Sequence, residues 1–219
     1  MSEHHGVWVY SERTDLVLEM LTKATELASK LKTETGALLV GSEVKAAADQ
    51  LAGSGADKVY VVDNPALKVF NAETYLSALT TVVKERKPEI ILFGSTRKGR
   101  ELAARLATRL ETGCVPDCTN LGLDEQGRLV SERVVYGGSA SASHVFVAKP
   151  QIACVPARTF EKHAPTEKKG EVVDLGIAQF DVPKTETVEV KPLEAGGGKL
   201  DEAKVVIVGG RGVEKKEDF

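Results

Sequence analysis

The 219-residue sequence lacks any apolar run long enough to cross a lipid bilayer. Its apolar segments, such as residues 90–93, have the length of a strand and fall far short of the roughly 20 residues that a spanning helix needs. Residues 1–6 also lack the basic and apolar regions of an export signal. These absences predict a protein without a membrane span that works in the cytoplasm.

Cysteine, histidine and aromatic residues are scarce. The three cysteines, Cys114, Cys118 and Cys154, are an odd number and do not suggest a disulfide framework, so we interpret them as small buried residues. The four histidines show no spacing that would complete a metal site with Cys114 and Cys118. Aromatic residues make up only 5% of the sequence, which predicts an aliphatic core.

The sequence also has no large excess of positive or negative charge, and it contains no recognisable set of catalytic residues. Its 29 basic and 32 acidic residues give a net charge of −3, and the basic residues are scattered, which argues against a nucleic-acid partner. There is no Ser-His-Asp pattern, no HExxH motif and no pair of carboxylates placed together by spacing. We therefore expect no catalysis by this chain alone.

Short apolar runs alternating with amphipathic helical segments dominate the first half of the chain. This alternation predicts right-handed crossovers and a doubly wound parallel sheet, the α/β fold class. After residue 112 the pattern changes to short alternating segments, which predict antiparallel additions. The expected parallel strands cover residues 6–11, 37–41, 58–63 and 90–93, with helices from about 16, 44, 72 and 99, and the later strands cover 120–123, 129–136, 145–147, 151–155, 172–175 and 187–190.

A glycine-rich segment divides the chain. We predict an α/β domain over residues 1–193 and a linker over 194–203, where three consecutive glycines stand among polar residues. Residues 204–219 then begin with a buried strand that runs into a glycine turn. We interpret this last segment as the opening of a second, phosphate-binding domain.

Two segments are candidate phosphate sites. Gly209, Gly210 and Gly212 would let the backbone approach a phosphate closely, and Arg211 would add a bidentate cation, although a tight structural turn would look much the same. Residues 94–100 carry hydroxyls and basic side chains at a helix N-terminus, and here we favour a capped helix start over a nucleotide site. In residues 137–143, small side chains suggest a close packing point rather than a flexible binding loop.

Several separated segments together resemble the alpha subunit of electron-transfer flavoproteins. They are residues 94–107, residues 112–119, Tyr136-Gly137-Gly138, Lys149-Pro150-Gln151 and residues 206–219. The family pattern covers most of the chain, and its glycine-arginine turn is the most specific match. The resemblance implies an N-terminal scaffold domain with an adenine-nucleotide-hydrolase-like sheet, followed by the start of an FAD-binding domain whose remainder, on the order of 100 residues, would lie beyond Phe219.

The resemblance also implies a function, a cofactor and partners. Family members are electron carriers rather than enzymes, and their FAD does the redox chemistry. In the family, FAD lies against the turn that corresponds here to Gly209, Gly210, Arg211 and Gly212. The chain would form a heterodimer with a beta subunit that holds AMP, accept electrons from acyl-CoA or other flavin dehydrogenases, and pass them to a quinone oxidoreductase or another acceptor.

Two other functions remain open at this point. A universal-stress-like adenine-nucleotide-binding module would use residues 94–100, and ATP or AMP binding would favour it. An adenylating or phosphotransfer enzyme would use residues 209–212, but this loop lacks the Ser or Asp acceptor that such chemistry needs.

Overall fold

The structure is a computed structural model that describes residues 4–162, 169–177, 179–191, 203, 205–213, 215 and 217. The chain divides into two units, residues 1–186 and 187–219. Our sequence-based boundary at residue 193 falls a few residues later.

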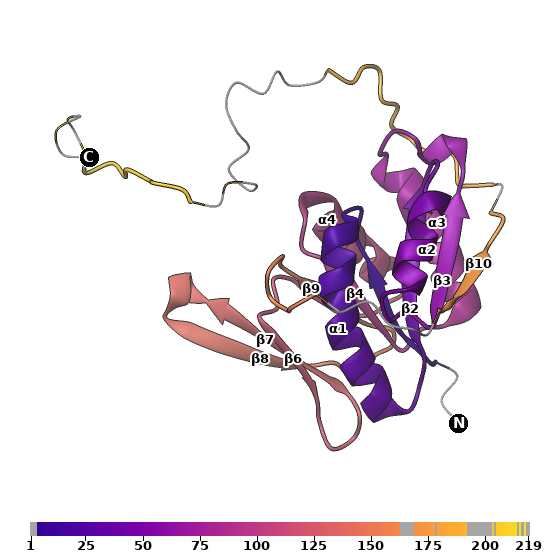
Figure 1. The fold of residues 1–219 in the computed structure, drawn as a ribbon, viewed down its shortest axis with the longest axis horizontal. Coiled ribbons are helices and arrows are strands. Elements are labelled where there is room, and N and C mark those ends of the chain that lie inside the picture. The colour runs from indigo at the N-terminus through magenta and orange to yellow at the C-terminus, as the bar shows by residue number, and fades with distance from the viewer. Residues whose placement is uncertain are drawn as a thin grey trace. The chain divides into compact units, whose positions relative to one another are not determined.

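The first unit is built on a parallel sheet, which confirms the predicted fold class (Figure 1). Among the described residues, seven strands pair in the order β10-β3-β2-β1-β4-β9-β5, and each neighbouring pair is parallel. Helices cover both faces, so the central strands are apolar along their whole length rather than alternating. The bounds are β1 Val7–Tyr10, β2 Thr35–Gly41, β3 Lys58–Asp63, β4 Ile90–Gly94, β5 Cys114–Val115, β9 Gln151–Val155 and β10 Glu171–Asp174.

The helices divide between the two faces of this sheet. Val7 and Val9 of β1 belong to the core beneath α1 and α2, whereas Trp8 and Tyr10 belong to the core beneath α3 and α4. This division follows from the period of two in a strand, which sends successive side chains to opposite faces. The helices are α1 Thr14–Leu31, α2 Lys45–Ala52, α3 Ala72–Arg86 and α4 Arg97–Arg109, with a short 3-10 helix, η1, at Pro65–Leu67. No helix in the described part of the chain is both long and apolar enough to traverse a bilayer.

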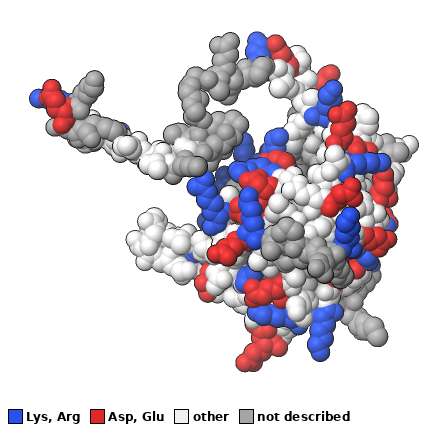
Figure 2. Space-filling view, viewed as in Figure 1, with Lys and Arg blue, Asp and Glu red and all other residues white. Residues whose placement is uncertain are grey.

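The strands predicted at 120–123 and 129–136 lie in a separate antiparallel sheet, and the strand predicted at 145–147 instead ends at Val145. The strands predicted at 151–155 and 172–175 are the parallel strands β9 and β10 of the main sheet, so the expectation of antiparallel pairing is wrong for them. In the described residues the antiparallel sheet has the order β6-β7-β8, with β6 Asn120–Leu123, β7 Leu129–Val135 and β8 Ala140–Val145. The β7–β8 hairpin projects from the body of the first unit (Figure 1). Its tip shows no charged side chains, while charges of both signs are interspersed over the rest of the visible face (Figure 2).

The expectation of a close packing point at residues 137–143 is wrong. The 3-10 helix η2, Tyr136–Gly138, and strand β8 occupy this segment. Gly137 and Gly138 have φ angles of 62° and 99°, and a Cβ added to either would meet no atom within 4 Å. Glycine is therefore needed here for the left-handed backbone of a hairpin turn, not for close contact.

The strands expected in the second unit are not observed among its described residues. The structure assigns no strand to residues 187–191 or 205–210, and Val205, Ile207 and Val208 are 81%, 78% and 80% exposed. An apolar run becomes a buried strand only where neighbouring strands supply hydrogen bonds and a face to cover. Lys204 and most of the predicted linker lie outside the described residues.

Candidate functional site

The strand order places one predicted site at the switch point of the sheet. β1 and β4 are neighbours, and the connections from their carboxyl ends leave toward opposite faces, to α1 and α4. Ligands of doubly wound folds usually bind in the crevice outside these strand ends. Residues 94–100, one of the two candidate phosphate sites, lie here.

The local structure of this loop confirms the capped helix start. The Gly99 backbone N donates to Thr96 Oγ1 at 2.9 Å, so Thr96 is the N-cap of α4. The Ser95 backbone N donates to the Val155 carbonyl at 2.7 Å, which ties the loop to β9. Gly99 is needed for a different reason, because a Cβ at this position would lie 2.0 Å from the Gly94 carbonyl oxygen. Helix α4 therefore begins in close contact with the end of β4.

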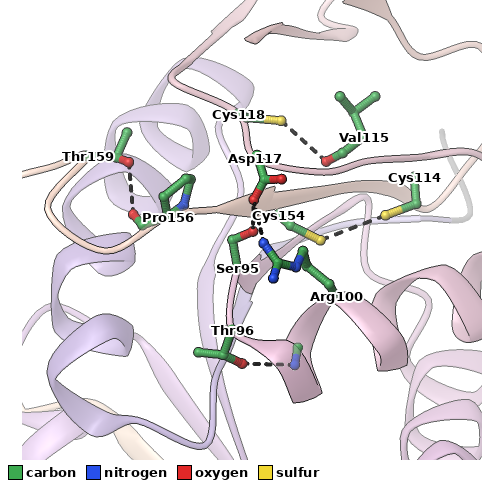
Figure 3. A network of polar contacts seen from close by, with 11 residues as sticks. Ser95, Thr96, Arg100, Cys114, Val115, Asp117, Cys118, Cys154, Pro156 and Thr159 are labelled. Atoms are coloured by element: carbon green, nitrogen blue, oxygen red, sulfur yellow. Dashed lines mark hydrogen bonds and ion pairs between the residues drawn. The ribbon is translucent and has the colours of Figure 1, made fainter. Parts of the chain in front are cut away.

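Two carboxylates already bond polar side chains of the loop, and Figure 3 shows the first of them, Asp117, beside Ser95 and Arg100. The Ser95 hydroxyl donates to Asp117 Oδ1, and Arg100 Nη1 lies 3.1 Å from the same oxygen. On the other side, the Thr96 hydroxyl donates to Glu12 Oε2 at 3.0 Å. A phosphate that bound here would have to displace these carboxylates, or it would have to share the hydrogen-bond donors of the loop with them. The Ser95, Thr96 and Arg100 side chains are therefore already bonded within the chain.

The ionisation of Asp117 reflects this arrangement. Partial burial by itself would raise the pKa of the carboxyl group, but the hydrogen bonds from Ser95 and Arg100 outweigh it and lower the pKa below its ordinary value. Asp117 has a left-handed φ of 54°, a region that Asp and Asn enter more readily than most residues. Sequence reasoning gave Asp117 no role, because its partners are 17 and 22 residues away and no local spacing connects them.

The cysteines differ in exposure. Cys118 and Cys154 are fully buried, as expected, whereas Cys114 is only partly buried. All three are free thiols, and no cluster of three or more potential metal ligands occurs within the described residues. The interpretation as small buried residues thus holds for two of the three positions.

The second candidate site, Gly209, Gly210, Arg211 and Gly212, forms an exposed turn. The Val213 backbone N donates to the Gly210 carbonyl at 3.1 Å. A Cβ at Gly210 or Gly212 would meet no atom within 4 Å, and neither residue has a left-handed φ, so neither this backbone nor its packing requires glycine. The donors of the turn and the Arg211 guanidinium have the chemistry to bind a phosphate, but the described residues provide no enclosure for a flavin ring.

The fold defines a doubly wound α/β domain whose switch-point loop is bonded to two carboxylates of the same chain. Residues 7–179 match the family model described as the electron transfer flavoprotein domain. The chain therefore belongs to the electron transfer flavoprotein family, a family of FAD-binding electron carriers. This membership favours electron transfer over the adenine-nucleotide-binding module.

Curated relatives match along the whole chain. The electron transfer flavoprotein subunit alpha of Clostridium acetobutylicum is 37% identical over 230 residues, which cover 100% of this chain and 68% of that protein. The subunit of the same name from Thermoanaerobacterium thermosaccharolyticum is 34% identical, and the match covers 100% of this chain and 69% of that protein. Protein FixB of Azorhizobium caulinodans is 35% identical, and the match covers 97% of this chain and 61% of that protein.

Proposed function

We propose that residues 1–186 act as the scaffold domain of an electron transfer flavoprotein alpha subunit rather than as a nucleotide site of their own. One observation carries this proposal: at the switch point, where a doubly wound domain would hold its ligand, Ser95 and Arg100 are bonded to Asp117, and Thr96 is bonded to Glu12. The side chains that would bind a phosphate are used to stabilise the loop. A domain of this kind contributes surface and rigidity to an assembly.

We further propose that Gly209, Gly210, Arg211 and Gly212 contact the pyrophosphate of FAD. The exposed turn supports this role, since glycines that neither the backbone nor the packing requires would permit the close approach of a ligand. Arg211 is exposed in this turn, and a guanidinium can form two parallel hydrogen bonds to a phosphate. Bound FAD supplies the one- and two-electron redox chemistry, and the protein supplies position and charge.

The proposed partners follow from the family. We propose a heterodimer with a beta subunit that holds AMP, electron donors among acyl-CoA or other flavin dehydrogenases, and a quinone oxidoreductase or another acceptor. A relative from Acetobacterium woodii, 36% identical, is named as a subunit of a lactate dehydrogenase (NAD(+),ferredoxin). The three free thiols fit a reducing compartment, which supports a cytoplasmic location.

Co-expression with a beta subunit from the same genome tests the scaffold role. We expect the two chains to copurify as a heterodimer and to bury an interface above roughly 1,000 Å², the usual lower limit for a stable complex. Size-exclusion chromatography with light scattering would measure the mass. A chain that stays monomeric with every beta subunit of its genome would contradict the proposal.

A further inference from the structure

Two of the three cysteines lie side by side on neighbouring strands. Cys114 is on β5, which is the edge strand of the parallel sheet, and Cys154 is on β9. Their sulfur atoms are 3.8 Å apart and point toward each other (Figure 3). The third cysteine, Cys118, instead directs its sulfur to the Val115 carbonyl at 3.3 Å. The fold therefore selects one pair of thiols, 40 residues apart in the sequence.

Solvent reaches the two members of this pair unequally. Cys154 is completely buried, whereas Cys114 is partly exposed and lines a cavity of about 210 Å³. Residues 112–115 form one side of this cavity and residues 144–148 the other. The cavity is large enough for a small molecule. A reagent in solution therefore meets Cys114 first.

The shifts in pKa also distinguish Cys114, the most exposed of the three thiols, from the two buried ones. The contact with Cys154 lowers the pKa of Cys114, because the neighbouring thiol donates a hydrogen bond to the thiolate. The same contact, together with burial, raises the pKa of Cys154. Burial raises the pKa of Cys118 to about 11. Since the thiolate is the reactive form, Cys114 is the nucleophile of the group.

We propose that Cys114 is an oxidation site for small hydroperoxides and that Cys154 is its resolving thiol. The Cys114 thiolate attacks the peroxide, an S–O bond forms, the O–O bond breaks, and water or an alcohol leaves after taking up a proton. Cys154 then attacks the sulfur of the sulfenic acid, an S–S bond forms, the S–O bond breaks, and the Cys154 proton leaves with the hydroxide as water. Two thiols lose two electrons, and the peroxide gains them.

The position of Cys114 makes the second step feasible. The sulfur atoms must approach from 3.8 Å to about 2.05 Å, the length of a disulfide bond. β5 has two residues and a single neighbouring strand, and a Cβ added at Gly113 would meet no atom within 4 Å, so the segment around Cys114 is not tightly enclosed. Cys114 pairs with Ile152, and Cys154 lies two residues further along β9. We expect a disulfide in this diagonal arrangement to be readily reduced by a dithiol.

The test treats the full 219-residue chain with hydrogen peroxide, blocks free thiols with an alkylating reagent, and digests the protein with trypsin without reduction. Cleavage after Arg109, Arg128, Arg133 and Arg158 gives one peptide with Cys114 and Cys118 and another with Cys154. Mass spectrometry should detect these two peptides cross-linked, and dithiothreitol should separate them. The matched variants are Cys114→Ser, which should abolish the cross-link, and Cys118→Ser, which should retain it.

Two further measurements do not depend on the folding of Cys114→Ser. Under native conditions, Cys114 of the unaltered chain should react with a thiol reagent on the order of tenfold faster than the buried cysteines, which react only after local opening. In Cys154→Ala, peroxide should leave a sulfenic acid on Cys114 that dimedone traps. A cross-link through Cys118, equal labelling of all three thiols, or oxidation of Cys114 with Cys154 still open to alkylation would each overturn the proposal.

Discussion

Arg100 and Asp117 form an ion pair across the switch-point loop, with Nη1 3.1 Å from Oδ1. Arg100 belongs to the first turns of α4, and Asp117 follows the edge strand β5. Because the Ser95 hydroxyl donates to the same carboxylate, one side chain joins the end of β4, the start of α4 and the segment after β5. This junction lies at the switch point, where related folds hold their ligands.

We expect Asp117→Asn to lower the free energy of unfolding at neutral pH by about 0.5 kcal/mol, a value for a partly exposed ion pair that solvent screens. Asn retains the size of Asp and tolerates its left-handed φ, so the change removes mainly the charge. The pKa of Asp117 is lowered in the folded state, so its contribution is complete above the unfolded value of about 3.9 and is lost as the pH falls through the folded value.

Urea denaturation at pH 7 and pH 3 measures this dependence, with Asp49→Asn as a control at an exposed position of α2. The difference between Asp117→Asn and the unaltered chain should shrink at the lower pH. An equal difference at both pH values would show that the charge of Asp117 is not the cause.

We expect no micromolar binding of ATP or AMP at residues 94–100. Micromolar affinity requires about 8 kcal/mol, and a phosphate would have to compete with two carboxylates at this loop. Lys98 is also engaged, because its Nζ lies 4.9 Å from the centre of the Phe70 ring. Isothermal titration calorimetry tests this expectation. Micromolar binding that Lys98→Ala removes and Lys84→Ala leaves intact would restore the nucleotide-binding module as the function of this domain.

Gly99→Ala should destabilise the chain although alanine favours helices. The new Cβ would lie 2.0 Å from the Gly94 carbonyl oxygen, a backbone atom that cannot move without shifting β4 or α4. Overpacking of this kind costs about 1 to 3 kcal/mol. Gly122→Ala is the matched control, because a Cβ there meets no atom within 4 Å. Thermal unfolding should give a clearly lower Tm for the first variant only, and equal Tm values would show that the helix can shift at no cost.

We expect the 219-residue chain by itself to retain no FAD. The described residues of the glycine turn are exposed, and a few backbone donors with one guanidinium supply only a few of the roughly 8 kcal/mol that micromolar affinity needs. Flavin absorbance of the purified chain tests this expectation, and a yellow protein would contradict it.

In a polypeptide extended to the length of the curated relatives, Arg211→Ala should weaken FAD binding about tenfold to a hundredfold, since a charged hydrogen bond contributes about 1.5 to 3 kcal/mol. Arg105→Ala, at an ion-paired position on α4, is the control for the loss of one positive charge. Flavin release measured by fluorescence should separate the two variants. Equal retention would remove Arg211 from the proposed site without affecting the family assignment.

Alkaline unfolding should depend on the buried tyrosines. Burial raises the pKa of Tyr10, Tyr60 and Tyr75. A raised pKa in the folded state stabilises the fold fully below the unfolded value of about 10, and this stabilisation is lost as the pH rises beyond it. An absorbance titration of phenolate should therefore show these tyrosines ionising together as the chain unfolds. Tyr10→Phe should make the loss of stability above pH 10 less steep, and an unchanged slope would exclude Tyr10 as a contributor.

The sequence by itself determined the alternating architecture of the first unit. The apolar run over residues 58–63 is the strand Lys58–Asp63, and the helical periodicity from residue 72 is the helix Ala72–Arg86. Both follow from local rules, namely the spacing of apolar side chains and the cap that Asn71 provides by accepting hydrogen bonds from the Glu73 and Thr74 backbone. The Thr96 cap of α4 is local in the same sense.

Only the tertiary structure decided which distant residues meet. The two-residue strand β5 has no periodicity of its own and exists because β9 pairs with it, and that pairing brings Cys114 to Cys154. Asp117 reaches Arg100 only because β5, which follows α4, pairs with β9, the strand beside β4. Conversely, the apolar residues 205–208 have the composition of a strand but remain exposed, since a strand needs a hydrogen-bonded neighbour that no local pattern can supply.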